Sequence, residues 1–256
     1  MDEQRPFQPV PATDRDDRAE GALTPAPWTF LDALGIFFVS LVLGGVTLGL
    51  LQALLDPELA RGVYFPASLL VLGGSVVGWI AVRYRERLGD LAGSRPTWRD
   101  VAAGLGHGAL AFLLINVGYS LVLQALTRLT GAEMPVVQEG LRDATQDGRV
   151  GILVIASALV VAPMAEELFF RGVLFRGLLG PLGAWPAIGI SGLLFGLAHY
   201  ETGNLQGSLY ALLVLASLGM YLAWAFNRRG TLLVPVLMHV TFNGLAVVGI
   251  QLGAAA

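Results

Sequence analysis

The sequence contains no cysteine and no lysine, and it is poor in charge. Without cysteine, the chain cannot form disulfides, use a thiolate nucleophile or bind zinc through sulfur. Charged residues make up 14% of the 256 residues, whereas an ordinary soluble domain has about 25%. The net charge of −3 gives no indication of a nucleic-acid partner. The absence of lysine is a compositional bias and assigns no chemistry.

Long apolar runs are what the sequence does contain. Hydrophobic residues make up 55% of the chain, and its mean hydropathy is +0.66. A membrane-spanning helix needs about 20 mostly apolar residues. The candidate segments are residues 28–55, 64–82, 101–126, 150–179, 184–200, 209–226 and 232–252. We therefore predict an all-α fold, a polytopic membrane helix bundle with about seven transmembrane helices.

The ends and loops of these segments suggest an orientation. Residues 1–27 are polar, acidic and proline-rich and lack the features of a signal peptide, so we expect a disordered tail followed by a single transmembrane domain at 28–256. Arginines cluster at 83–99 and in "NRRG" at 227–230, which places both segments and the N-terminus on the cytoplasmic side. The loop 127–149 then lies outside and has room for a short interfacial helix. We expect an integral protein of a bacterial or archaeal cell membrane.

The fourth segment carries three charges inside an apolar run, Glu166, Glu167 and Arg171. Each charge at the centre of a membrane helix costs about 2.5–3.5 kcal/mol. Glu167 and Arg171 are four residues apart, so they share a helix face and can form a supporting ion pair. Glu166 is left out of that pair. Its carboxyl is either protonated and structural, or it faces a water-filled cavity beside the helix that Pro163 loosens.

Three polar residues on other segments are candidate partners for Glu166. His199 ends the fifth segment, and His239 and Asn243 share a face of the seventh. Counting residues from the segment ends places Glu166 and His199 at the same depth, and His239 somewhat shallower. A carboxylate base, an imidazole and further donors are what hydrolysis by an activated water requires.

The same groups are also ordinary metal ligands. A divalent metal such as zinc held by Glu166, His199 and His239, and a site with no cofactor, are both compatible with the sequence. The H-E-x-x-H motif of common zinc proteases is absent. His107 has no motif around it, and we interpret it as a hydrogen-bonded structural residue. Phe195 is expected to serve packing, and the tryptophans and arginines at segment ends are expected to be interface anchors.

Three short motifs give the sequence a family resemblance. They are E-E-x-x-x-R at Glu166 to Arg171, F-x-x-x-H at Phe195 to His199, and H-x-x-x-N at His239 to Asn243. Their order, on three separate predicted helices, resembles the CAAX-processing and bacteriocin-processing intramembrane endopeptidases, the CPBP family. The resemblance covers about residues 150–248, which would be the protease-like core.

The resemblance implies a helical bundle around an intramembrane catalytic cavity and hydrolysis of a peptide bond near the C-terminus of a peptide or protein substrate, prenylated in some members. It implies that Glu166 is the base and His199 its partner on the water. It also implies an oxyanion site at His239 and Asn243, supported by Glu167 and Arg171. Two alternatives stay open, a non-proteolytic immunity or scaffold protein of the same fold and a small transporter with a carboxylate proton relay.

Overall fold

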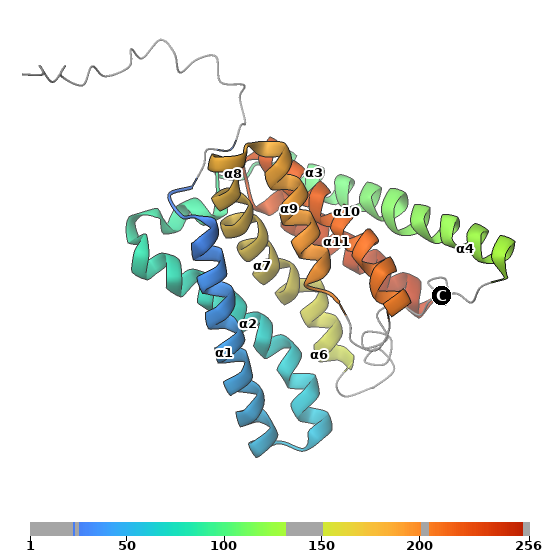
Figure 1. The fold of residues 1–256 in the computed structure, drawn as a ribbon, viewed down its shortest axis with the longest axis horizontal. Helices are drawn as coiled ribbons and strands as arrows, with labels where there is room; N and C mark the ends of the chain where they lie inside the picture. The colour runs from blue at the N-terminus through green and yellow to red at the C-terminus, as the bar shows by residue number, and fades with distance from the viewer. Residues whose placement is uncertain (1–22, 24–25, 132–150, 201–204, 253–256) are drawn as a thin grey trace, which may run out of the picture.

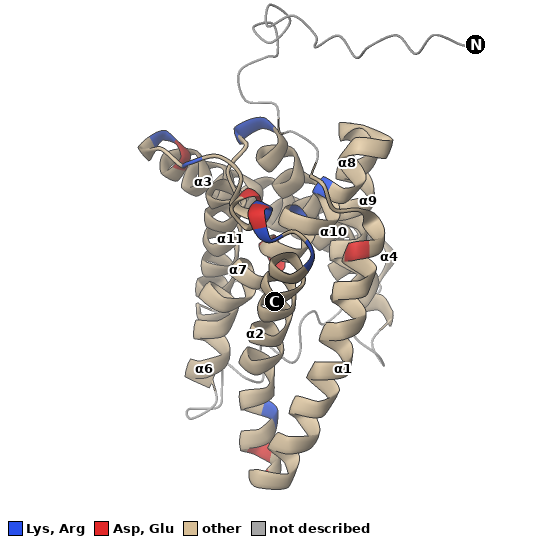
Figure 2. Ribbon diagram, turned by 90° about the vertical axis from the view of Figure 1, so that its left-hand side faces the viewer, with Lys and Arg blue, Asp and Glu red and all other residues tan. Residues whose placement is uncertain are grey.

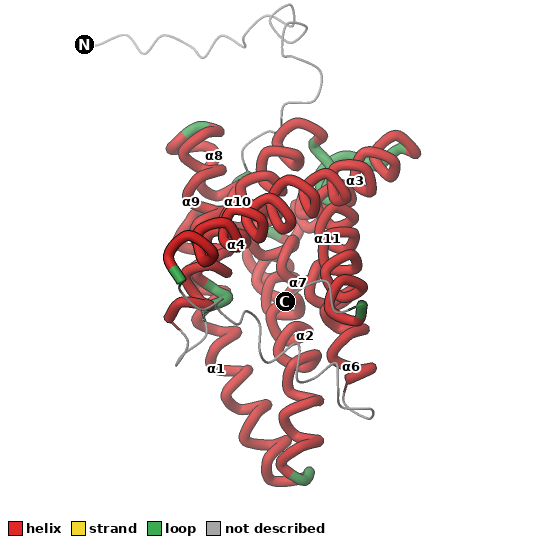
Figure 3. The backbone as a smooth tube through the Cα atoms, turned by 90° about the vertical axis from the view of Figure 1, so that its right-hand side faces the viewer, coloured by secondary structure: helices red, strands yellow, loops and turns green. Residues whose placement is uncertain are grey.

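The computed structural model describes residues 23, 26–131, 151–200 and 205–252. Within these ranges the chain is helical, and the one β-type contact is an isolated bridge between Gly93 and Thr231 (Figure 3). The predicted disordered tail lies almost wholly outside the described residues. A short helix in the loop 127–149 would fall at 132–149, which also lies outside them.

Among the described residues, six continuous helical segments are long and apolar enough to cross a membrane, so the predicted all-α, polytopic membrane fold is confirmed. The first two are α1 (Phe30–Leu54) and α2 (Pro57–Arg83), and η2 (Arg85–Ala92) follows them as a 3₁₀ helix. The third runs through α3 (Trp98–Ala111), the π-helical η3 (Phe112–Val117) and α4 (Gly118–Thr130). The fourth comprises α6 (Gly151–Ala156), η4 (Ser157–Val161), α7 (Ala162–Glu167), η5 (Leu168–Phe175) and α8 (Arg176–Leu182). The last two are α10 (Leu205–Arg229) and α11 (Leu233–Gln251), and α9 (Ala184–Leu197) lies between the fourth segment and α10.

Several predicted segments differ in length from the observed helices. The second and sixth, predicted at 64–82 and 209–226, are longer, at Pro57–Arg83 and Leu205–Arg229. The helix predicted at 184–200 ends at Leu197 after 14 residues, because the chain turns at Ala198. The third segment is longer than predicted, running over 33 residues from Trp98 to Thr130. It begins early because Thr97 and Asp100 form a reciprocal capping box, and it ends at Gly131, whose φ of 69° is left-handed.

Glycines allow two pairs of helices to pack closely. Gly192 and Gly196 bring α9 against α10, and Gly104 and Gly108 bring α3 against α11, the helix that carries His239. A Cβ atom on Gly108 would lie 2.7 Å from the carbonyl oxygen of Met238. Figure 1 shows α1 and α2 side by side and α4 extending away from the bundle.

The two arginine-rich segments lie at the same end of the bundle. The backbone N–H of Ser94 donates to Gly230 (2.8 Å), and that of Leu232 donates to Ala92 (2.9 Å), so the segment after α2 is joined to the turn between α10 and α11. Figure 2 shows that most charged segments gather at this end. The predicted co-location of the two segments is confirmed, and their cytoplasmic orientation stays a prediction.

Asp32 joins the beginning of α1 to the end of α2 at this same end. Its buried carboxylate accepts hydrogen bonds from Thr29, Trp79 and Tyr84 and forms an ion pair with Arg83 at 3.3 Å. Burial, and then the hydrogen bond to Asp32, raise the pKa of the Tyr84 hydroxyl. The phenol therefore stays protonated and keeps donating to the carboxylate.

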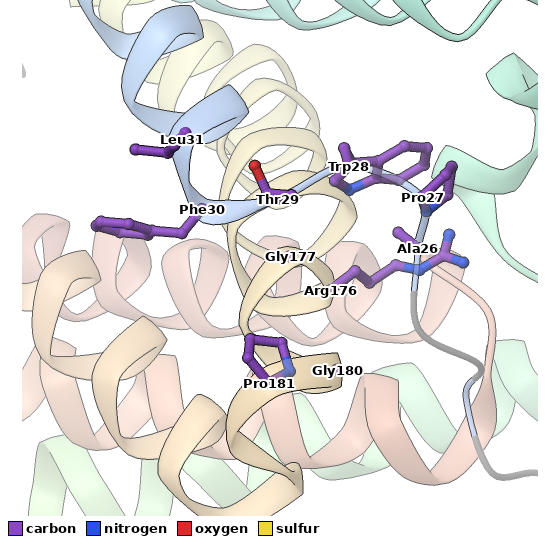
Figure 4. Close-up of a pocket in the computed structure, with 10 residues that line it drawn as sticks. All are labelled: Ala26, Pro27, Trp28, Thr29, Phe30, Leu31, Arg176, Gly177, Gly180 and Pro181. Atoms are coloured by element: carbon purple, nitrogen blue, oxygen red, sulfur yellow. The ribbon is translucent and has the colours of Figure 1, made fainter.

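A cavity of about 360 Å³ lies between the chain that leads into α1 and helix α8 (Figure 4). Trp28 and Arg176 line it together, with the guanidinium 5.1 Å from the centre of the indole ring. The Trp28 indole N–H donates to the carbonyl of Gly172 at 3.1 Å. None of the predicted site residues lines this cavity, so it contributes to how α1 is anchored and not to the candidate site.

The close contact of Gly108 on α3 with α11 leads to a prediction on stability. Gly108→Ala should lower the free energy of unfolding by about 1–3 kcal/mol, because its new Cβ overlaps the backbone of α11. Gly106→Ala on the same helix is the matched control, since a Cβ there has no atom within 4 Å and should be neutral or stabilising. Thermal unfolding in detergent measures both, and equal melting temperatures would contradict the proposed close contact.

Candidate active site

The structure brings Glu166 and the two predicted histidines together from three helical segments. Glu166 lies near the end of α7, His199 two residues beyond α9, and His239 in the second turn of α11. Glu166 Oε2 is 3.9 Å from Nε2 of His199 and 3.9 Å from Nε2 of His239. The site is sheltered but not sealed, because 13% of the Glu166 side chain and 31% of the His199 side chain are exposed.

Counting residues along the helices placed His239 too shallow. The structure shows no such mismatch, because His239 Nε2 is as close to Glu166 as His199 Nε2 is. The turn before α11 is buried at Gly230, Thr231 and Leu232, and the backbone bond from Leu232 to Ala92 fixes its position. His239 therefore reaches Glu166 although it lies only a few residues into its helix.

Hydrogen bonds at Nδ1 determine which nitrogen of each imidazole faces Glu166. Nδ1 of His199 lies 2.8 Å from the carbonyl oxygen of Phe195, and Nδ1 of His239 lies 3.0 Å from Oε1 of Glu167. A carbonyl oxygen and an ionised carboxylate only accept hydrogen bonds, so Nδ1 carries a proton in both rings. In each neutral ring, Nε2 is then a lone-pair acceptor directed toward Glu166.

The predicted pair between Glu167 and Arg171 is confirmed. Arg171 Nε lies 3.0 Å from Glu167 Oε2, and both side chains are 0% exposed. The angle at this contact is poor for a hydrogen bond, so the interaction is mainly electrostatic. Arg171 Nη2 donates a well-formed bond to the carbonyl of Gly219 on α10, at 3.0 Å.

The bond from His239 to Glu167 was not predicted from the sequence. It joins residues 72 positions apart, and no spacing rule connects them. Glu167 therefore has two functions, as counter-charge for Arg171 and as the acceptor that orients His239. The sequence signal that could have suggested it is the adjacency of two carboxylates, because one of the two must point away from the water.

Phe195 packs against three of these residues. Its ring centre is 4.7 Å from the guanidinium carbon of Arg171, 4.9 Å from the His199 ring and 5.5 Å from the His239 ring. The side chain is fully buried, which agrees with the packing role predicted for it. A cation over an aromatic face is a stabilising contact, so the ring also supports the buried charge of Arg171.

Asn243 is held by a carbonyl that Pro163 leaves free. Its side-chain nitrogen donates to Ala158 at 2.9 Å. Ala158 lies in a π-helical turn, in which Ala162 N–H already bonds the carbonyl of Ser157, five residues earlier. The next donor in that register is residue 163, and proline has no N–H. Among the described residues, Asn243 forms no hydrogen bond with Glu166 or the histidines, so its predicted oxyanion role stays a prediction.

The donor atoms as they lie do not fit a tightly held zinc ion. Two ligands about 2.1 Å from a tetrahedral zinc are roughly 3.4 Å apart, which is shorter than the 3.9 Å between Glu166 Oε2 and either Nε2. Across the described ranges, no set of three or more His, Asp or Glu side chains is placed to hold a metal ion.

His107 lies outside this site. Its Nδ1 is 2.6 Å from the hydroxyl of Tyr221 on α10, and its ring also packs against Trp224. The structural hydrogen-bonding role predicted for His107 is thus confirmed.

The buried ion pair gives a prediction on stability. Arg171→Met should lower the free energy of unfolding by about 3–5 kcal/mol, because it leaves the Glu167 carboxylate without its counter-charge. Arg87→Gln, which removes the exposed Arg87–Asp90 pair, should cost less than about 1 kcal/mol. Chemical unfolding in detergent compares the two variants. Similar losses of unfolding free energy would show that the buried pair contributes no more to stability than the exposed pair.

Because Pro163 leaves the Ala158 carbonyl free for Asn243, we predict that Pro163 and Asn243 are energetically coupled. In Pro163→Ala, a new N–H competes for Ala158, so Asn243→Ala should cost less there than in the natural background. A double-mutant cycle on unfolding free energies should give a coupling of about 0.5–1.5 kcal/mol. Strict additivity of the two changes would mean that the proline does not act through Ala158.

Comparison with known proteins finds similarity in the part of the chain that carries Glu166, His199 and His239. Residues 148–245 match the family model described as Type II CAAX prenyl endopeptidase Rce1-like. CAAX prenyl protease 2 of Homo sapiens is 33% identical over 97 residues, covering 33% of this chain and 30% of the human protein. No solved structure matches the chain. The family resemblance indicated by the three motifs is therefore confirmed, because the part of this integral membrane protein that carries the candidate site is similar to the Rce1-like family.

Proposed function

We propose that this protein is an intramembrane endopeptidase of the CAAX-protease type, in which a glutamate and histidines activate water. The observation that carries the proposal is the convergence of Glu166 Oε2 with Nε2 of His199 and of His239. The Rce1-like character of residues 148–245 supports the same chemistry. The matched region covers 30% of the human relative, so the activity of the whole chain is part of the proposal.

Glu166 is proposed as the general base. Its Oε2 is buried and has no hydrogen-bond partner among the described residues. A water about 2.8 Å from both Glu166 Oε2 and an imidazole Nε2 spans the 3.9 Å between those atoms. Because Nε2 of neutral His199 is an acceptor, the water's two protons point at Glu166 and His199, and its lone pair is directed elsewhere.

The reaction then follows ordinary amide hydrolysis. Glu166 takes one proton as the water oxygen bonds to the carbonyl carbon, and the C=O electron pair moves to the oxygen. The tetrahedral intermediate collapses when the C–N bond breaks and Glu166 returns the proton to the amine. No step is routed through a metal, because Glu166 Oε2 as it lies is too far from either Nε2 for the two to share a tetrahedral zinc ion.

His239 and Asn243 are proposed to stabilise the oxyanion. Asn243 uses one side-chain N–H on Ala158 and retains a second. His239 can donate from Nε2 only as an imidazolium, since Nδ1 already carries a proton directed at Glu167. The Glu167 carboxylate is the counter-charge for that state, which makes it a positioning residue for His239. His199, fixed by the Phe195 carbonyl, orients the water.

The proposed substrate is a peptide or protein, cleaved near its C-terminus and carrying a lipid. A carboxylate base inside the fourth apolar segment is accessible to a peptide that reaches membrane depth. A lipid on the peptide supplies that partitioning, at about 0.8 kcal/mol per buried CH₂ group. The name of the human relative, CAAX prenyl protease 2, agrees with such a substrate.

Single-turnover cleavage tests this proposal. Purified protein should cleave C-terminal peptides, and prenylated ones faster than unmodified ones. Glu166→Gln should abolish cleavage, because an amide of the same shape cannot accept the proton. Asn243→Ala should lower the rate on the order of 10²–10³-fold, as for loss of an oxyanion donor. His107→Asn is the matched histidine control and should cleave normally, since His107 lies outside the site.

Three results would overturn the assignment or part of it. Turnover at the natural rate by Glu166→Gln would exclude Glu166 as the base. Loss of activity on adding a chelator, with recovery on adding zinc, would mean that the three donors close around a metal. If the natural protein cleaves none of the peptides, while Glu166→Gln also leaves its cellular phenotype intact, a non-proteolytic scaffold or immunity role would be the better description.

A further inference from the structure

Arginines accompany most of the tryptophans in this protein. The chain has five tryptophans, and four of them lie with an arginine guanidinium within 6 Å of the ring centre. The pairs are Trp28 with Arg176, Trp79 with Arg83, Trp98 with Arg99, and Trp224 with Arg228. Indole rings at helix ends mark the membrane interface, so these guanidinium groups lie near the level of lipid headgroups.

Three exposed arginines of this end gather around the turn between α10 and α11. Arg95 follows Ser94, whose N–H is bonded to Gly230. Arg99 precedes Asp100, which forms an ion pair with Arg229 at 2.8 Å. Arg228 precedes Arg229 on α10. We refer to Arg95, Arg99 and Arg228 as the arginine surface.

The arginine surface has an excess of positive charge. In the part of the chain that the structure describes, none of its three guanidinium groups forms an ion pair, although each is exposed. The nearest carboxylates along the chain are already engaged, Asp100 with Arg229 and Asp90 with Arg87. The surface is therefore suited to an anionic partner from outside the chain.

An apolar stripe on α3 continues from this surface. Trp98, Val101 and Leu105 follow the i, i+3, i+7 pattern, so they lie on one face of the helix. They are 75%, 41% and 47% exposed. The stripe descends along a membrane-spanning helix from the level of Arg99, which is the arrangement of an acyl chain below its headgroup.

We propose that the arginine surface and the α3 stripe bind an anionic phospholipid. Arg95, Arg99 and Arg228 bind the phosphate and the remaining headgroup charge, for which a guanidinium supplies paired N–H donors. The acyl chain lies along Trp98, Val101 and Leu105. An acidic protein would match the arginines alone and would leave the stripe unused, so the combination favours a lipid. The proposal is independent of the catalytic assignment, because no residue of the candidate site takes part.

Native mass spectrometry of the full chain in a neutral detergent tests this proposal. The probes are dioleoyl phosphatidylglycerol and dioleoyl phosphatidylcholine, which share acyl chains and differ in charge. The natural protein should retain phosphatidylglycerol in preference. The Arg99→Gln/Arg228→Gln variant should bind it on the order of tenfold more weakly, because each basic residue at a lipid surface contributes severalfold to affinity. Raising the salt concentration should also weaken binding.

The matched control is Arg61→Gln/Arg128→Gln, which removes two exposed arginines that lie outside the arginine surface. It should retain the lipid as the natural protein does, because Arg61 lies near the beginning of α2, whereas the arginine-rich segment follows the end of that helix. Equal retention of both lipids, or equal loss in the two double variants, would overturn the proposal. Binding of poly-glutamate without preference for phosphatidylglycerol would overturn it in favour of an acidic protein partner. Thermal unfolding of each variant separates lost binding from lost folding.

Discussion

The buried ion pair between Glu167 and Arg171 is the interaction on which the candidate site depends. Two fully buried charges inside a membrane helix are costly unless their hydrogen-bonding groups are used. Here each partner has a second function. Arg171 bonds the Gly219 carbonyl of α10 and lies over the Phe195 ring of α9, while Glu167 accepts from His239 of α11. One ion pair thus fixes the relative positions of the helices that carry the other site residues.

The backbone of the fourth segment is adapted to the same purpose. Its α-helical turn at Ala162–Glu167 lies between two π-helical stretches, and wide turns of this kind leave carbonyl groups available to other partners. Pro163 withholds the N–H that would occupy the Ala158 carbonyl, and Asn243 takes its place. Close packing at the glycines of α3 and α9 holds α11 and α10 near enough for these bonds to form, because a side chain there would separate the helices by a distance greater than a hydrogen bond tolerates.

The two chemical regions of the molecule are separated along the bundle axis. Catalytic candidates lie within the bundle, whereas the exposed arginines and their tryptophans lie at one end of it. The acidic residues between these two regions already have hydrogen-bond and ion-pair partners. Asp32 and Asp100 are buried and bind helix caps and arginines at that end, so they stabilise the helix ends without cancelling the outward charge of the arginine surface. The proposed lipid contact at this end is therefore separate from the candidate site inside the bundle.

The sequence by itself determined the fold class, the helical segments and most members of the candidate site. Apolar runs of spanning length, and the four-residue spacing of Glu167 and Arg171, are local properties, so they follow from composition and helix geometry. Only the tertiary structure decided which nitrogen of each histidine faces Glu166, that Glu167 holds His239, and that Asn243 binds Ala158. The bonds of His239 and Asn243 join helices distant in the chain, the bond of His199 is local, and two of the three acceptors are backbone carbonyls. Every residue carries a carbonyl group, so no pattern of side chains reveals which one packing leaves free.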